Sequence, residues 1–358
     1  MGNSITSPVS APLIIPVFMS FDGAYAIGAA VAMYSLLEYA SKFKEETPIT
    51  YHLHCLIKDV SATQQSQLQE TVSLFANHAK LFFHPIEDID QNLESYLPNS
   101  VAKRYGAIVL CRLLLSSLFP QYEKIISVDV DTVFMGDISP AFFVLDDKPE
   151  CHLAMPKDVG PDEFDTLDAY ITYTKGYYKG RGVEINFTHE EWQKHYQAYA
   201  TGFMVTHLDR WRTQNLEQAC IDLLKTRGES FFLPELGIVN ILFYDQILEL
   251  PRCYCASFEH HSDFCATQRV VMLHFFRPKP WVIGELGFPS YRGGGPWLEA
   301  LLHTPFKFDF LERCCNTFFE ERRKNIDISR LEGWLAKDVL LDYVLYRIKK
   351  KLKNFFGA

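Results

Sequence analysis

Apolar and polar residues along the first 140 positions form short apolar runs separated by longer stretches with helical spacing. Runs rich in β-branched and aromatic residues are typical of buried strands, and apolar residues three or four positions apart are typical of helices. Strands that alternate with helices predict an α/β fold with a mostly parallel, doubly wound sheet. The predicted strands are 13–19, 49–57, 81–86 and 125–134, and the predicted helices are 25–39, 61–79 and 107–119.

The run 125–134 carries two carboxylates, Asp129 and Asp131, one residue apart at the end of its apolar part. Unpaired acids inside a hydrophobic strand are costly, so we expect both at the exposed carboxyl end, where open α/β sheets bind ligands. Two neighbouring carboxylates repel each other, and a divalent cation removes that repulsion. Oxygen ligands favour Mg²⁺ or Mn²⁺, which can also bridge a diphosphate. A strand that merely runs into an acidic turn is the alternative interpretation.

Beyond residue 150 the regular alternation of strands and helices ends. Residues 161–198 are polar, aromatic and irregular, which is typical of a surface insertion. A strand at 270–275 contains His274 near its end, and a basic, proline-rich loop, 277–281, follows. Further strands are predicted at 152–156 and 199–205, and further helices at 208–227 and 234–244.

The composition is that of a soluble globular protein, with 48% hydrophobic and 22% charged residues among 358. The formal net charge of −9 argues against general nucleic-acid binding. Nine cysteines without metal-ligand spacing, and no basic region before an apolar run in residues 1–12, fit reduced thiols in a cytosol. Since no stretch reaches the roughly 18 apolar residues of a membrane span, we expect a cytoplasmic protein that does not cross a bilayer.

The C-terminal segment 342–356 differs from the rest of this acidic chain because it is basic and amphipathic. Five cations lie between Arg347 and Lys353 with no acid among them, and apolar residues recur at helical spacing. Such a helix predicts contact with an anionic membrane surface. A solvated terminal helix packed on the domain is the alternative.

Several motifs in a fixed order resemble the retaining glycosyltransferases of family 8, above all the bacterial lipopolysaccharide glucosyl- and galactosyltransferases. The resemblance runs from about residue 16 to residue 281 and includes the basic tail. Each motif alone is weak, and their order makes them specific. The motifs are Arg112, the strand and Asp-X-Asp turn at 124–140, the loop 157–159, His274 and the Lys-Pro-Trp segment 279–281.

The resemblance implies a type A glycosyltransferase fold, a Rossmann-like mixed sheet flanked by helices, which binds a sugar nucleotide with Mn²⁺ or Mg²⁺. Asp129, Asp131 and His274 would ligate the metal, and this mixed oxygen and imidazole set suits Mn²⁺. The metal would act as a Lewis acid on the departing nucleoside diphosphate. Lys279 would add a positive charge at the same oxygens.

The resemblance also implies which residues bind the donor. Asp22 and Tyr25, at the exit of the first strand, would hold a uracil base, and Arg112 would hold the donor sugar together with Asp158. The same donor-binding set includes Val130 and Gly202. Structural alternatives exist, because Tyr25 could be a core residue and Arg112 an ordinary ion-pair partner.

The implied reaction needs no protein nucleophile, because the departing phosphate oxygen can take the proton of the acceptor. Asp158 and Glu235 would then act as catalytic residues by stabilising a positive sugar ring electrostatically. The chain departs from the family pattern mainly around the sugar and acceptor sites, which leaves room for a degenerate, non-catalytic domain. The departures are Ala24, Ala200, Leu236 and Arg277.

The resulting prediction is a metal-dependent retaining hexosyltransferase that moves galactose or glucose from a UDP-sugar to a saccharide or lipid-linked glycan, such as the lipopolysaccharide core. Residues 1–285 would form the glycosyltransferase domain. Residues 286–358 would form a helical region whose basic tail attaches the enzyme to the inner face of the cytoplasmic membrane.

Two alternatives come from other classes of protein. In a haloacid-dehalogenase-type phosphatase, Asp129 would be the nucleophile and Asp131 the acid/base, although three strands precede this pair where that family has none. In a non-enzyme, the same site would bind a sugar nucleotide without transferring it.

Overall fold

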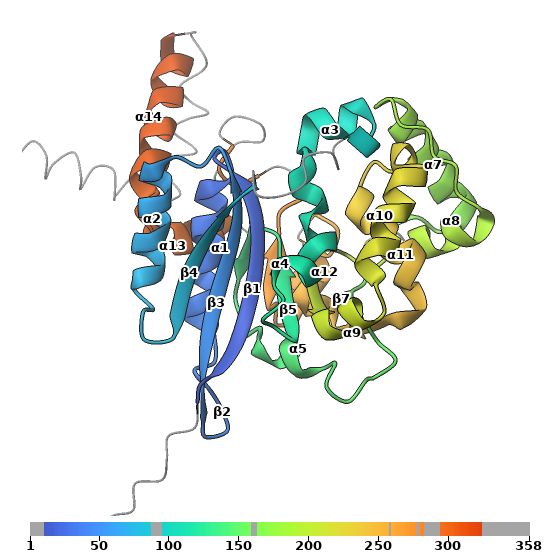
Figure 1. The fold of residues 1–358 in the computed structure, drawn as a ribbon. Helices are drawn as coiled ribbons and strands as arrows, with labels where there is room; N and C mark the ends of the chain where they lie inside the picture. The colour runs from blue at the N-terminus through green and yellow to red at the C-terminus, as the bar shows by residue number, and fades with distance from the viewer. Residues whose placement is uncertain are drawn as a thin grey trace, which may run out of the picture.

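The computed structural model describes residues 11–86, 95–158, 163–257, 259–276, 279–282 and 294–323. An eight-stranded sheet in the order β2-β3-β1-β5-β8-β7-β9, with β4 paired to β3, forms the centre of the molecule (Figure 1). Its strands are β1 Leu13–Asp22, β2 Phe43–Lys44, β3 Thr47–Lys58, β4 Ala79–Pro85, β5 Lys124–Val128, β7 Leu153–Pro156, β8 Phe203–His207 and β9 Ile247–Leu250. A second, two-stranded sheet joins β6 Thr132–Phe134 to β10 Met272–His274.

The sheet is mixed, as expected for a type A fold. Strands β4, β3, β1 and β5 run parallel, whereas β8 is antiparallel to both β5 and β7. The first half of the chain therefore has the parallel βαβ arrangement that its alternating pattern predicts.

Helices cover the sheet as two groups that lie on opposite sides of it (Figure 1). The first group comprises α1 Ala26–Tyr39, α2 Ala62–Ser73, α13 Gly294–Leu302 and α14 Lys307–Arg323. The second comprises α3 Asn99–Tyr105, α7 Leu167–Lys179, α8 His189–Tyr196, α10 Leu216–Arg227 and α11 Pro234–Phe243. Short helices complete the chain: α4 Leu115–Leu118, α5 Ser139–Phe143, α9 Leu208–Thr213 and α12 Ser262–Thr267, with 3₁₀ turns at Ala107–Leu114, Gly228–Ser230, Tyr244–Gln246 and Arg252–Tyr254.

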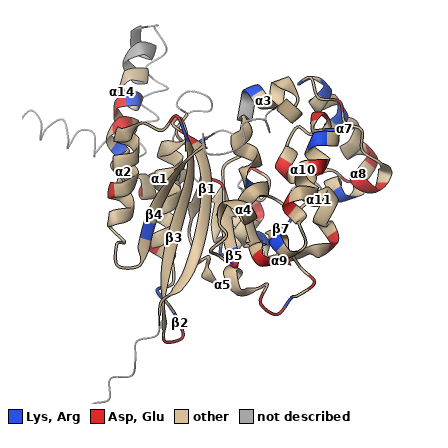
Figure 2. Cartoon of the chain, in the orientation of Figure 1, with Lys and Arg blue, Asp and Glu red and all other residues tan. Residues whose placement is uncertain are grey.

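Two hydrophobic clusters correspond to the two faces of the sheet. Ile15, Val17 and Met19 of β1 belong to the cluster that includes α1, whereas Phe18 belongs to the cluster that includes α11. Because strand side chains alternate between faces, β1 contributes to both cores. Figure 2 shows acidic and basic residues interspersed over α7, α8 and α10.

The structure corrects four sequence-based expectations. The run 125–134 is not one strand, because β5 ends at Val128 and β6 joins another sheet. The stretch 107–119 is mainly a 3₁₀ helix, and 208–227 is two helices separated at Asn215, whose φ is +55°. The stretch 161–198 was expected to be irregular, yet it contains α7 and α8, each with a side-chain N-cap from a threonine.

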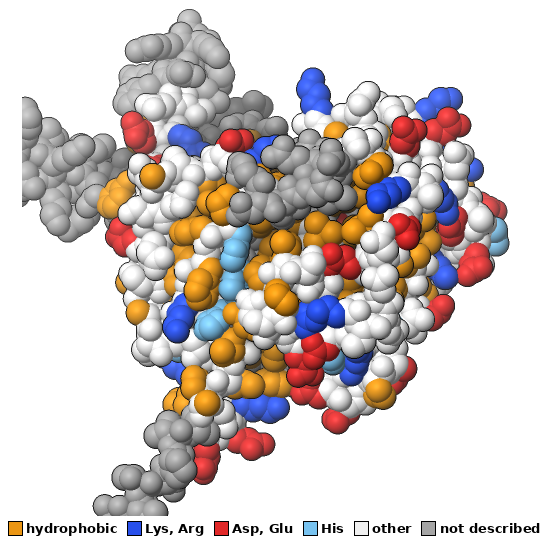
Figure 3. All heavy atoms as spheres, viewed as in Figure 1, with side chains coloured by type: hydrophobic (Ala, Val, Ile, Leu, Met, Phe, Trp, Pro, Cys, Tyr) orange, Lys and Arg blue, Asp and Glu red, His pale blue; other side chains and the backbone are white. Residues whose placement is uncertain are grey.

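Part of the sheet face seen in Figure 3 bears histidines among hydrophobic side chains. On β3 and β4, His54 Nδ1 lies 3.0 Å from His84 Nε2, and the Tyr122 hydroxyl lies within 2.9 Å of both His54 and His52. No helix in the described ranges is long and apolar enough to cross a membrane.

The predicted division after residue 285 stays a prediction. Helix α13, beyond that position, packs on α1, and its Trp297 belongs to the same core as Trp281. The basic tail 342–356 lies outside the described residues.

Candidate functional site

The two carboxylates lie in the break between β5 and β6. The Asp129 N–H donates to the Gly202 carbonyl at 2.9 Å, so backbone hydrogen bonding continues one residue beyond β5, to the segment before β8. After Asp131 the chain enters β6, which pairs antiparallel with β10 so that Thr132 faces His274. The Phe275 N–H donates to the Asp131 carbonyl at 2.9 Å. This pairing brings His274, 143 positions after Asp131 in the chain, against the Asp-X-Asp turn.

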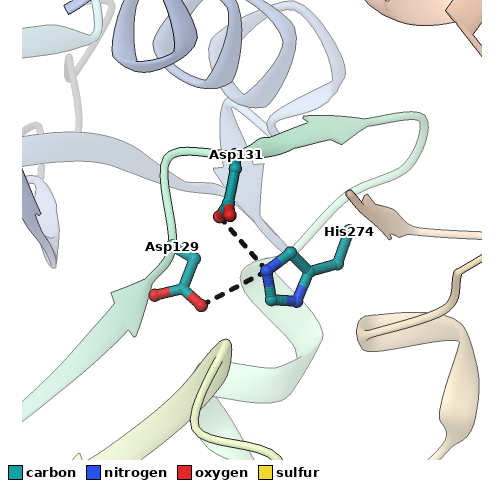
Figure 4. A group of neighbouring side chains, drawn as sticks. All are labelled: Asp129, Asp131 and His274. Carbon is teal, nitrogen blue, oxygen red and sulfur yellow. Dashed lines mark hydrogen bonds and ion pairs between the residues drawn. The ribbon is translucent and has the colours of Figure 1, made fainter. Parts of the chain in front are cut away.

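Asp129, Asp131 and His274 form a cluster that could hold a metal ion (Figure 4). His274 Nε2 lies 3.1 Å from Oδ1 of Asp131 and 3.4 Å from Oδ2 of Asp129. One ligand atom from each side chain lies within 4.8 Å of the other two. Two carboxylate oxygens and one imidazole nitrogen are a donor set that suits Mn²⁺, so the residues present fit such an ion.

Two cations balance the two carboxylates. Arg112 is buried and forms an ion pair with Asp129, while it also donates to the Thr201 carbonyl at 2.7 Å. Lys279 forms an ion pair with Asp131 and donates to the Phe275 carbonyl at 2.8 Å. Arg112 and Lys279, which are not part of the cluster, therefore fix the two carboxylates in position through charge-assisted hydrogen bonds.

The orientation of the His274 ring has two local causes. The Cys255 thiol lies 3.6 Å from Nδ1, which leaves Nε2 directed at the carboxylates. Gly202 also lies against the ring: a Cβ there would come within 2.8 Å of His274 Nδ1 and 3.2 Å of Asp129 Oδ2. The absence of a side chain at Gly202 is thus what lets the strand approach both ligands.

The charges inside the cluster strongly shift the pKa values of Asp131 and His274. Burial alone would raise the pKa of Asp131, but His274 and Lys279 hold that pKa well below its usual range. Burial alone would lower the pKa of His274, but the Asp131 carboxylate raises it well above its usual value. Without a metal, the imidazolium and carboxylate therefore stabilise each other, as expected of closely paired opposite charges.

Glu235, at the start of α11, is buried close to this cluster. Burial raises the pKa of Glu235 to about 7, although the charge of Arg112 opposes this shift. Its Oε2 atom has no hydrogen-bond partner among the described residues. A buried carboxyl group with an unused oxygen is rare outside functional sites.

One cavity of about 940 Å³ contains this cluster. Every site residue predicted from the sequence lines it, and their individual roles stay predictions. Asp22 also accepts hydrogen bonds from the N–H groups of Ala24 and Tyr25 at the start of α1, and the Tyr25 ring packs edge-on against Trp281 at 5.3 Å. The predicted residues on the cavity wall are Asp22, Tyr25, Arg112, Asp129, Val130, Asp131, Asp158, Gly202, Glu235, His274 and Lys279.

Sequence reasoning missed the aromatic part of this wall. The tyrosines of α7 line the cavity beside Phe164 and Phe232. Their spacing of three and four residues was the available signal, but the surrounding polar residues favoured an irregular insertion. Of the departures from the family pattern, Ala200 and Leu236 line the cavity, and Arg277 lies outside the described residues.

His260 also lines the cavity, where its Nδ1 lies 2.6 Å from a carboxylate oxygen of Glu163. This contact joins the insertion to the loop before β10.

Comparison with protein families gives one match: the model of glycosyl transferase family 8 matches residues 16–283. No curated protein matches the chain. Residues 16–283 contain all the predicted site residues.

Solved glycosyltransferase structures share the fold at low sequence identity. The apo structure of the bifunctional glycosyltransferase WbbM has a TM-score of 0.62 and 19% identity over 86% of this chain. The chain spans only 52% of the length of WbbM. Galactosyltransferase LgtC, solved with donor and acceptor sugar analogs, has a TM-score of 0.59 and 13% identity over 81% of this chain and 96% of its own. GlyE of Streptococcus pneumoniae TIGR4 has a TM-score of 0.51 and 18% identity over 80% of this chain and 61% of its own.

Proposed function

Because the chain belongs to glycosyltransferase family 8, we propose that it transfers a hexose, galactose or glucose, from a UDP-sugar to a glycan acceptor with retention of configuration. The acceptor class is a saccharide or lipid-linked glycan such as the lipopolysaccharide core. Membership of this family excludes the haloacid-dehalogenase-type phosphatase, because the nucleophile loop of that phosphatase family belongs to a different fold.

The charge balance of the cluster is the observation that carries the proposal. Asp129 and Asp131 are matched by Arg112 and Lys279, so a divalent cation bound to the two carboxylates gives this group of four side chains an excess positive charge. A diphosphate supplies the opposite charge and the oxygen atoms that Mn²⁺ or Mg²⁺, Arg and Lys bind. The likeness to LgtC, solved with donor and acceptor sugar analogs, fits a site for a sugar nucleotide.

The reaction breaks the bond between the sugar's anomeric carbon and the phosphate oxygen and forms a bond from the same carbon to the acceptor oxygen. The acceptor proton passes to the departing phosphate oxygen, and nucleoside diphosphate leaves. When bound, the metal supplies Lewis acidity for that departure. Lys279 stabilises the charge that develops on the phosphate, and the Glu235 and Asp158 carboxylates stabilise the positive sugar ring.

Release of UDP from UDP-galactose or UDP-glucose tests this proposal. We expect release with Mn²⁺ and none with EDTA, and calorimetry should show tighter binding of UDP than of GDP or CDP. Binding of UDP without any release from either sugar nucleotide would favour the degenerate binding protein instead. Equal binding of the three nucleotides would contradict the base-selecting role of Asp22 and Tyr25.

We also propose that the protein works at the inner face of the cytoplasmic membrane through its tail. The support is the sequence alone, in which five cations between Arg347 and Lys353 accompany apolar residues at helical spacing. Each cation near an anionic leaflet gains about 1 kcal/mol. Removal of residues 343–358 should release the protein from anionic liposomes in a flotation assay, and equal flotation of both forms would contradict this.

A further inference from the structure

The cavity that holds the metal-binding cluster has a second lining made of aromatic rings. Residues 170, 173, 174, 177 and 178 recur along α7 at intervals of three and four, so they share one face of the helix. All five line the cavity. Tyr173 is 56% exposed, so its ring is not buried in the hydrophobic core.

The rings of this face are held in place by their neighbours. The Tyr170 hydroxyl lies 2.5 Å from His195 Nδ1 of α8, and the Tyr196 hydroxyl donates to the Phe164 carbonyl at 2.6 Å. The Tyr173 ring packs on Phe164 and on Tyr177, at centroid distances of 5.1 and 5.9 Å. A ring fixed in this way loses little conformational freedom when a ligand packs on it.

The shape of the aromatic face indicates what packs there. A pyranose ring has an apolar face of C–H groups and an edge of hydroxyls, and the C–H face matches the negative face of a tyrosine ring. From Tyr170 to Tyr177 the helix rises roughly 10 Å, which is longer than one sugar ring. The carboxylates of Asp158 and Glu163 lie on the same wall and disfavour a strongly anionic ligand.

We propose that the aromatic face of α7, with Tyr173 at its exposed point, is a stacking subsite for a neutral acceptor saccharide of at least two rings. This rests on the proposed glycosyltransferase function and adds the class of acceptor. Tyr173 is then a specificity-determining residue that contacts the acceptor while the metal cluster binds the donor.

Saturation-transfer NMR with lactose and maltose tests the subsite in full-length protein loaded with MnCl₂ and UDP. We expect transfer to ring protons of at least one disaccharide and weaker transfer to glucose. Tyr173→Ala should weaken disaccharide binding about 3- to 10-fold, the size of one aromatic contact. Tyr173→Phe should retain binding because the ring is kept. Tyr39→Ala is the matched control, since Tyr39 is 48% exposed at the end of α1 and outside the cavity lining.

The results separate this proposal from the proposed function. Absence of transfer to both disaccharides, or equal transfer in the wild type and Tyr173→Ala, would overturn the subsite. Loss of UDP affinity in Tyr173→Ala would overturn it too, because the ring would then hold the base. Failure of the wild type to bind UDP with Mn²⁺ would instead refute the proposed function. The two failures can be told apart because saccharide binding can also be measured without nucleotide.

Discussion

The Nε2 atom of His274 lies 3.1 Å from Oδ1 of Asp131, although 143 residues separate the two in the chain. The antiparallel pairing of β6 with β10 produces this contact. The larger sheet ends before Asp129, so it does not bring His274 to the carboxylates. The two-stranded sheet does this, and it thereby completes the metal-binding cluster. Changes in β10 should act on the metal site even where they touch no ligand.

Asp131→Asn should abolish most metal-dependent activity. The change removes a charge from the predicted ion and leaves Lys279 without its partner, so we expect a loss of about 10²-fold or more in UDP release. Mn²⁺ titration of the same variant should show weaker binding. Asp147→Asn, at an exposed acid that does not line the cavity, is the control. Unchanged turnover of Asp131→Asn in excess Mn²⁺ would remove Asp131 from the ligand set.

Gly202→Ala should weaken metal binding without unfolding the protein. Its Cβ would come within 2.8 Å of His274 Nδ1, and displacement of a supported ligand typically costs 10- to 100-fold in metal affinity. Gly176→Ala on α7 is the matched control, because its Cβ would meet nothing within 4 Å. That control should be neutral or more stable by up to ~1 kcal/mol. Equal Mn²⁺ affinity of the two variants would refute the role of Gly202.

Glu235 should make the metal-free protein less stable as pH rises. Burial raises the pKa of Glu235 to about 7, whereas the unfolded chain releases this proton near its ordinary value of 4.5. Between these values the folded state holds more protons, so the free energy of unfolding falls as pH rises, by about 3 kcal/mol in all. Glu235→Gln should remove this slope in urea unfolding with EDTA.

The rate of transfer should rise with pH as Glu235 ionises, in contrast to the stability, which falls. If its carboxylate stabilises a positive sugar ring, the rate of transfer rises as Glu235 ionises around pH 7, and Glu235→Gln flattens that profile at a low rate. Glu70→Gln, on the exposed side of α2, should change neither profile. A profile of Glu235→Gln that still rises through pH 7 would assign the ionisation to another group.

His54 should make the fold sensitive to acid. Burial, with the neighbouring His84 and His52, lowers the pKa of His54 to about 3. Below the ordinary pKa of about 6.5 the unfolded state takes up a proton that the folded state does not, so stability falls as pH drops, by about 2 kcal/mol at pH 5. His54→Phe should lose less stability than the wild type between pH 7 and pH 5, measured by urea unfolding. His189→Phe, at an exposed position on α8, should behave like the wild type.

The sequence predicted best those elements whose pattern is set by local packing. Strand β1 alternates between two cores and helix α1 is apolar all round, so both were located within a few residues. The run 125–134 was wrong as one strand because its break depends on partners far along the chain, Gly202 and Phe275. Asn215 splits a predicted helix through a left-handed backbone conformation that apolar spacing does not reveal.

For the site, the metal-binding cluster was predictable because its residues form an ordered set of motifs. Cys255 was not, since a single buried cysteine has no distinguishing pattern before its distance to His274 is known. The aromatic lining was missed because helical spacing in a polar insertion shows only that residues share a face. It does not show whether that face meets a core or a cavity.

The metal-binding cluster and the aromatic face of α7 come from different lengths of chain. The cluster is built from residues 129–131 and 274, whereas α7 and α8 occupy a continuous insertion between β7 and β8. The insertion can therefore diverge, or be exchanged for that of a relative, without changing any residue of the metal-binding cluster. If the aromatic face of α7 binds the acceptor as proposed, exchanging this one segment would change the accepted glycan, while the donor sugar would stay that of the recipient protein.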